Sequence, residues 1–153
     1  MSERQTLVEP GDREILSSRM FDAPRELVWK AWTNPDLLKE WWGPKGFTNT
    51  FHEFDLRPEG EWRFVMHGPD GRDFQNKSVF VEIVKPERIV FDHVVAPRFR
   101  ATVTFEDLGN GKTKLVWSML FETAAVYDGV KGFAIEGNKQ NLDKLEALLA
   151  KQS

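Results

Sequence analysis

The sequence has 153 residues, of which 41% are hydrophobic and 12% aromatic, a net charge of −3 and no cysteine. This length and apolar content predict one domain with a sizeable core. The charges are interspersed, which excludes a basic nucleic-acid groove, and the lack of cysteine excludes disulfides, thiolate nucleophiles and cysteine-based zinc sites. No segment has the length of a membrane span and we find no secretory signal, so we expect a cytoplasmic protein with neither membrane nor nucleic-acid partners.

The polar residues 1–12 predict a mobile N-terminal segment, followed by a single domain over residues 13–153. Glu14–Phe21 is predicted as the first strand. Two short helices, Pro24–Thr33 and Pro35–Trp42, each open with a proline, whose fixed φ suits the first helical position. Each carries an apolar, tryptophan-bearing face that must be buried against the rest of the chain. This arrangement indicates a lid over a sheet.

Regular turn signals divide the middle of the chain into six further strands. The predicted strands are Phe47–Arg57, Glu61–His67, Lys77–Val84, Ile89–Val95, Phe99–Glu106 and Lys112–Phe121. The clearest hairpin turn is Leu-Gly-Asn-Gly at 108–111. Short turns predict an antiparallel meander, and the first strand can join its edge, which makes about seven strands.

Hydrophobic alternation identifies one aromatic face of this sheet. Trp62, Phe64 and Met66 share one face of their strand, and Leu115, Trp117 and Met119 share one face of the last strand. The opposite face is mostly polar. A sheet of this kind is covered on one side only.

The covering element is predicted as a long C-terminal helix over residues 126–151. Its second half is clearly amphipathic, but its first half contains Gly129, Gly132 and Gly137. Each glycine costs about 1 kcal/mol relative to alanine inside a helix. We expect them to make room where the helix approaches the sheet, for close backbone packing or for a ligand.

Several sequence runs together resemble a known superfamily. They are FDAPRELVWKAWTNP at 21–35, WWGP at 41–44, DLRPEGEW at 55–62, GPDG at 68–71, PERI at 86–89 and FEDLGNGKT at 105–113. Over residues 13–150 the chain resembles the START/Bet v 1-like (SRPBCC) superfamily, and within it the branch related to the C-terminal domain of the activator of heat-shock protein 90 ATPase. The resemblance implies an α+β helix-grip fold, with a curved antiparallel sheet around the long C-terminal helix.

Two positions depart from the pattern of that branch. Glu59-Gly60 stands where the family usually has two glycines, and Gly137-Asn138 stands where it usually has glycine and tryptophan. If Asn138 faces inward, the loss of a bulky aromatic side chain enlarges the cavity or makes its wall more polar. At the other position, Glu59-Gly60 keeps the glycine that a bulge at this turn needs.

The sequence carries no motif for a catalytic nucleophile or a phosphate-binding loop. Its histidines, His52, His67 and His93, lack metal-ligand spacing. We interpret His52 and His67 as surface residues, although a bulge at Glu59-Gly60 leaves their facing open. His93 shares parity with Ile89 and Phe91, which predicts an inward, hydrogen-bonded side chain more readily than a catalyst.

The favoured hypothesis is that the protein binds a small, mostly apolar molecule between the sheet and the C-terminal helix, without changing it. This hypothesis involves no catalytic residue, metal or cofactor. The predicted ligand-binding residues are Trp41, Trp42, Trp62, Phe64, His93, Phe99, Trp117, Met119, Phe133 and Asn138.

Two alternatives stay open. Related cyclases and dehydratases use such a cavity for catalysis, and here His93, Asp55 or Glu136 would supply acid–base chemistry. The resemblance also implies a stress-related co-chaperone with a chaperone partner, but 153 residues leave no room for the additional N-terminal domain of the eukaryotic activator. We therefore rank the co-chaperone role lower. The sequence leaves the oligomeric state open, a homodimer included.

Overall fold

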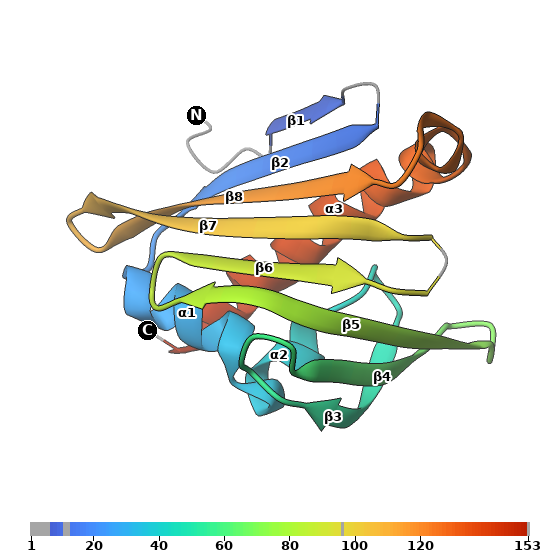
Figure 1. Ribbon diagram of the computed structural model, residues 1–153. Coiled ribbons are helices and arrows are strands. Elements are labelled where there is room, and N and C mark those ends of the chain that lie inside the picture. Colours follow the sequence, from blue (N-terminus) through green and yellow to red (C-terminus); the bar gives the residue numbers. More distant parts are fainter. Residues whose placement is uncertain (1–6, 11–12, 96, 153) are drawn as a thin grey trace.

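An eight-stranded antiparallel sheet forms most of the molecule, and the long helix α3 lies across one of its faces (Figure 1). The computed structural model describes residues 7–10, 13–95 and 97–152. In chain order the elements are β1 (Leu7–Pro10), β2 (Glu14–Phe21), α1 (Arg25–Thr33), α2 (Pro35–Trp41), β3 (Thr48–Phe54), β4 (Glu61–His67), β5 (Asp73–Val84), β6 (Arg88–His93), β7 (Phe99–Gly109), β8 (Lys112–Phe121) and α3 (Ala124–Gln152). The strand order is β1-β2-β8-β7-β6-β5-β4-β3.

The predicted α+β helix-grip architecture is confirmed. Seven strands, β2 to β8, form the meander and its edge, and two short helices follow the first of them (Figure 1). Leu7–Pro10 belongs to the N-terminal segment for which the sequence predicted no strand. These residues pair antiparallel with Ile15–Ser18 and add an eighth strand at the sheet edge. The remaining residues of the segment 1–12 lie outside the described residues.

The two short helices are joined through Asn34. Its backbone N–H donates to the Lys30 carbonyl at the end of α1, and its side chain accepts from the Asp36 N–H at 3.0 Å to cap α2. The Trp41 indole N–H then donates to the Ala31 carbonyl at 3.0 Å. Because this bond links the end of α2 to α1, the two helices pack as one unit against the sheet.

The alternation predicted for the inner face is confirmed in β4 and β8. Trp62, Phe64, Leu115 and Trp117 are all buried, while the residues between them are mostly more exposed. The register shift that was considered for the Glu59-Gly60 turn lies instead in β3, between Phe51 and Glu53. The β3–β4 hairpin therefore has its β-bulge at His52.

Gly60 allows two backbone segments to approach closely in the turn between β3 and β4. Its N–H donates to the Arg57 carbonyl, and a Cβ at this position would overlap the Asp55 carbonyl oxygen. Only glycine fits so close an approach of two backbone segments. Glu59, just before it, has a positive φ of 70°.

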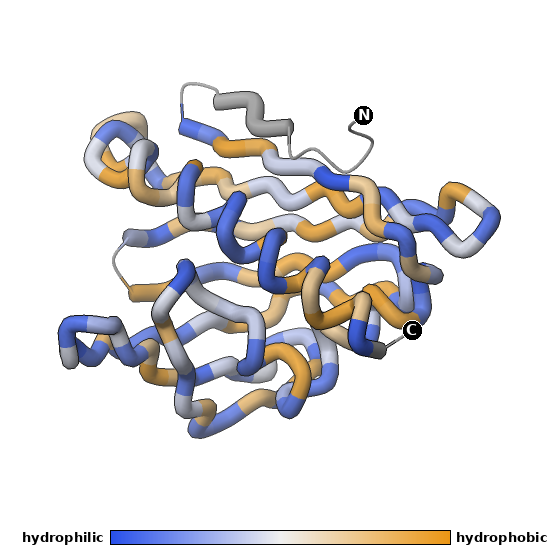
Figure 2. The backbone as a smooth tube through the Cα atoms, turned by 180° about the vertical axis from the view of Figure 1, so that it is seen from behind, coloured by the Kyte–Doolittle hydropathy of each residue, from blue (hydrophilic) through white to orange (hydrophobic). Residues whose placement is uncertain are grey.

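The two halves of α3 are attached differently. The second half buries Leu142, Leu145, Leu148 and Leu149, and the orange hydrophobic residues of the helix gather there in Figure 2. A buried arginine on β2, Arg19, adds polar ties, since its guanidinium donates to Asp143 at 2.7 Å and to Glu146 at 3.0 Å.

The first half of α3 is held more loosely, and between Tyr127 and Gly137 no residue is fully buried. The expectation for two glycines was wrong: Gly129 and Gly132 are exposed, and a Cβ on either would meet nothing within 4 Å. They do not make room against the sheet. None of the helices in the described part of the chain is long and apolar enough to span a membrane.

Candidate functional site

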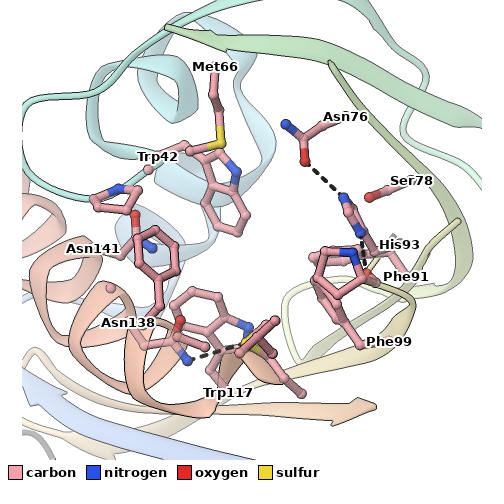
Figure 3. Close-up of a pocket in the computed structure, with 18 of the residues that line it drawn as sticks. Trp42, Met66, Asn76, Ser78, Phe91, His93, Phe99, Trp117, Asn138 and Asn141 are labelled. Carbon is pink, nitrogen blue, oxygen red and sulfur yellow. Dashed lines mark hydrogen bonds between the residues drawn. The ribbon is translucent and has the colours of Figure 1, made fainter. Parts of the chain in front are cut away.

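A cavity of about 340 Å³ lies between the inner face of the sheet and the first half of α3. Strands β4 to β8, helix α3 and the segment after α2 supply its walls (Figure 3). The lining residues are Trp42, Gly43, Pro44, Trp62, Phe64, Met66, Asn76, Ser78, Phe91, His93, Pro97, Phe99, Trp117, Met119, Phe121, Val130, Phe133, Ala134, Gly137, Asn138 and Asn141. The fold therefore leaves a space of ligand size at the centre of its aromatic face.

Nine of the ten residues predicted to bind a ligand line this cavity. The exception is Trp41, which lies in the core with 1% of its surface exposed. Its ring packs edge-on against Trp32 at 4.8 Å between centroids, and its N–H is taken by the Ala31 carbonyl. Trp42 follows the end of α2 with an extended backbone, and it faces the cavity while Trp41 faces α1.

Phe133 marks the opening of the cavity. It is the most exposed of the large hydrophobic side chains in the described part of the chain, at 70%, although it also lines the cavity. Val130 and Ala134 lie beside it on α3 and are half-buried. The cavity thus reaches the surface under the loosely attached half of α3.

The lining is aromatic and aliphatic apart from five polar side chains, Asn76, Ser78, His93, Asn138 and Asn141. Asn76, Ser78 and His93 come from β5 and β6, whereas the other two come from α3 (Figure 3). No aspartate, glutamate, lysine or arginine is among the lining residues. A ligand here would meet two separate polar groups across an apolar, uncharged space.

The inward position predicted for His93 is confirmed, with 8% of its surface exposed. Its Nδ1 lies 2.8 Å from the Pro97 carbonyl oxygen, and its Nε2 lies 2.8 Å from Asn76 Oδ1 (Figure 3). The ring also stacks on Phe99 at 4.9 Å between centroids. Burial lowers the pKa of His93, against the opposing effect of the backbone carbonyls of Pro97 and Val95.

Asn138 and Asn141 are buried on the face of α3 that lines the cavity. The Asn138 amide nitrogen donates to Ser17 Oγ and to Met119 Sδ, both at 3.3 Å. The expectation that Asn138 faces inward is therefore confirmed. Gly137, beside it, is the one member of the glycine trio that lines the cavity, and a Cβ there would lie 3.6 Å from Pro44 Cγ.

Sequence reasoning missed Asn76, Ser78 and Asn141. Two signals were available for them. Asn76 and Ser78 share one face of a strand with Phe80, which is buried. Asn141 follows Asn138 by three residues, which places both side chains on one face of the helix. What was missing was the register that brings these faces to the same cavity.

The other candidates for acid–base chemistry lie away from the cavity. Asp55 accepts a hydrogen bond from Arg57 Nε at 2.9 Å, and Glu136 is exposed and accepts from Gln140. His52 is exposed, and His67 lies between Thr50 Oγ1 and Asp73 Oδ1, at 2.7 Å from each. In the part of the chain that the structure describes, no cluster of His, Asp or Glu side chains could hold a metal ion.

Comparison with known proteins agrees with this architecture. The family model for the activator of Hsp90 ATPase homolog 1-like protein matches residues 22–150. The chain belongs to this family. The activator-like family is part of the SRPBCC superfamily, so the resemblance read from the sequence runs is confirmed. No curated protein matches the sequence.

Solved structures show the same fold over nearly the whole chain. A protein from Arthrobacter aurescens is 25% identical, with a TM-score of 0.88 over 95% of this chain and 91% of its own. A protein from Rhodobacter sphaeroides is 24% identical, with a TM-score of 0.87 over 97% of this chain and 100% of its own. A protein from Silicibacter pomeroyi, described as AHSA1, is 19% identical, with a TM-score of 0.77 over 92% of this chain and 99% of its own. The last two likenesses concern the fold alone.

Proposed function

We propose that this member of the activator-like family binds a small, mostly apolar molecule in the cavity between the sheet and α3. The observation that carries the proposal is a cavity of about 340 Å³ whose walls are aromatic and aliphatic and include no charged side chain. Small-molecule sites have this form, in which apolar walls supply the affinity and a few polar groups orient the ligand.

Binding without chemistry is favoured over catalysis by the state of the polar groups. Both ring nitrogens of His93 face protein atoms, the Pro97 carbonyl and the Asn76 amide, rather than the cavity. No carboxylate lines the space, so the cavity holds no second group to act with His93 as an acid–base pair. The cyclase-like alternative would need such an acid–base pair in the cavity. No contact among the described residues favours the co-chaperone role.

A fluorescent apolar probe tests the proposal. N-phenyl-1-naphthylamine should bind the protein with an increase in fluorescence, and Asn138→Trp should abolish or strongly weaken that binding by filling the cavity. The matched control is Lys139→Trp, which places the same side chain one residue further on α3, where the native side chain is exposed.

Binding that survives Asn138→Trp, or that is lost equally in Lys139→Trp, would contradict the assignment of the ligand to this cavity. Circular dichroism of both variants establishes that the fold is retained. A ligand that binds only the native state also raises the unfolding temperature by mass action. The probe should therefore raise the melting temperature of the native protein and of Lys139→Trp, but not of Asn138→Trp.

A further inference from the structure

We infer that the ligand carries an uncharged hydrogen-bond donor, a hydroxyl or an N–H group, and that this donor binds the amide oxygens of Asn138 and Asn141 on α3. The inference rests on the proposed function, because it concerns the orientation and chemical class of a ligand in the same cavity. It follows from an asymmetry between the two polar groups of the lining.

The polar side chains of β5 and β6 are largely occupied by the protein itself. Asn76 donates its amide hydrogen to the Phe74 carbonyl at 3.1 Å, and its oxygen faces His93 Nε2 at 2.8 Å. His93 Nδ1 contacts the Pro97 carbonyl. Among the described residues at this end of the cavity, only the Ser78 hydroxyl makes no such bond.

The amides on α3 present acceptors instead. Asn138 uses its nitrogen for Ser17 and Met119, which leaves its oxygen on the other side of the amide group. Asn141 has 6% of its surface exposed, and its Oδ1 is buried without a hydrogen-bond partner. A buried oxygen without a partner is unfavourable, and a donor on the ligand would satisfy it.

The spacing of the two residues suits a shared contact. Residues three apart lie side by side on a helix surface, and both asparagines line the cavity from the same side (Figure 3). A donor group at this side of the cavity would lie beside both asparagine side chains. The amides therefore act as a polar anchor at one end of an otherwise apolar ligand.

The lining also indicates that the donor is uncharged. An ammonium group would be buried with no carboxylate near it, and a carboxylate ligand with no lysine or arginine, since neither kind of side chain lines the cavity. Lys144 comes near the wall, but its Nζ donates to the Gly43 carbonyl at 3.1 Å. A carboxylate probe tests whether that charge nevertheless attracts an anion.

Four probes share one aromatic scaffold and differ in charge and in the presence of a hydrogen-bond donor. They are naphthalene, 2-naphthol, 2-methoxynaphthalene and 2-naphthoate. Displacement of N-phenyl-1-naphthylamine at neutral pH ranks their affinities. We expect 2-naphthol, which has a donor, to bind about tenfold more tightly than 2-methoxynaphthalene, which has none. In Asn141→Leu and Asn138→Leu this ratio should fall toward one, while naphthalene binding is kept.

The matched control is Gln75→Leu, which makes the same amide-to-alkyl change at an exposed position of β5 outside the cavity. Its 2-naphthol preference should equal that of the native protein. If a leucine variant fails to fold by circular dichroism, the alanine variant at the same position provides the same comparison with less steric demand.

The results distinguish a failure of this inference from a failure of the proposed function. Binding of all probes without a 2-naphthol preference, or a preference that survives both asparagine variants, overturns the inference and leaves the proposed function standing. Tightest binding by 2-naphthoate overturns the uncharged class. If the 2-naphthol preference is lost in Ser78→Ala but kept in both asparagine variants, the ligand's donor binds at β5 rather than at α3, which also overturns the inference. Absence of binding by every probe overturns the proposed function and the inference with it.

Discussion

The indole of Trp117 belongs to the core and to the cavity wall at once. It packs edge-on against Trp32 and at a tilt against Trp42, in each case with 5.6 Å between ring centroids, and 2% of its surface is exposed. It thus connects the helix pair to the last strand. Aromatic contacts of this kind contribute beyond the apolar area that they bury.

Trp117→Ala should therefore destabilise the protein by about 3–5 kcal/mol, because the rigid sheet cannot collapse into the space that the ring leaves. Urea unfolding should show a lower midpoint. Val116→Ala, on the opposite face of the same strand, is the control and should cost much less, since Val116 is only half-buried. An unchanged midpoint for Trp117→Ala would mean that the ring contributes little to the core.

His93 should make stability depend on pH. Burial is the largest cause that lowers its pKa, and the charge of Arg98 lowers it further, while the hydrogen bonds to the Pro97 and Val95 carbonyls act in the opposite direction. In the unfolded chain the pKa is about 6.5. Below that pH the unfolded state takes up a proton that the folded state resists, so the stabilisation is present above about pH 6.5 and is lost as pH falls.

Two measurements check this. The imidazole resonances of His93 in nuclear magnetic resonance spectra should titrate with a midpoint below 6.5. The urea midpoint should fall less steeply between pH 7 and pH 5 in His93→Gln than in the native protein. A midpoint above 6.5 would show that the hydrogen bonds outweigh burial, and the slope would then have the opposite sign.

At the scale of the element, α3 combines a firmly packed half with a loosely packed one. Leucines and the ion pairs of Arg19 hold the second half against β2, whereas the first half covers the cavity and carries two exposed glycines. Glycine lowers helix stability because it loses more backbone entropy on folding than other residues. The part of the helix over the cavity opening is therefore also its intrinsically weakest part.

Replacing both exposed glycines, Gly129→Ala and Gly132→Ala, should raise stability by roughly 1–2 kcal/mol in total, because the added Cβ atoms meet nothing within 4 Å. Urea unfolding measures the change. The contrasting control is Gly60→Ala, which should destabilise, since its Cβ would overlap the Asp55 carbonyl. A double variant that is less stable than the native protein would mean that the first half of α3 is not held as a helix.

At the scale of the whole molecule, one aromatic face serves as both core and cavity wall. Trp62 stacks on Phe64 at 4.8 Å and contacts Phe91 edge-on at 5.5 Å between ring centroids, and all three residues also line the cavity. The side chains around the cavity are thus held by their neighbours in the core. Such a wall keeps its shape when the cavity is empty, which reduces the entropy cost of binding a ligand.

Much of this could be predicted from local pattern. Period-two alternation identified the inner faces of β4 and β8, and proline and glycine marked most of the turns. The same parity placed His93 inside. These features depend on residues near one another in the sequence, because the strand and the helix each repeat with a short, fixed period.

The tertiary structure alone decided which of these inner residues surround a space and which fill one. Trp41 and Trp42 are neighbours with the same chemistry, yet one donates to Ala31 in the core and the other faces the cavity. Asn76 and Asn141 reached the site through the pairing of β5 with β6 and the placement of α3. The physical reason is that a cavity is bounded by segments distant in the sequence, whose relative register depends on packing over the whole chain and on no single period.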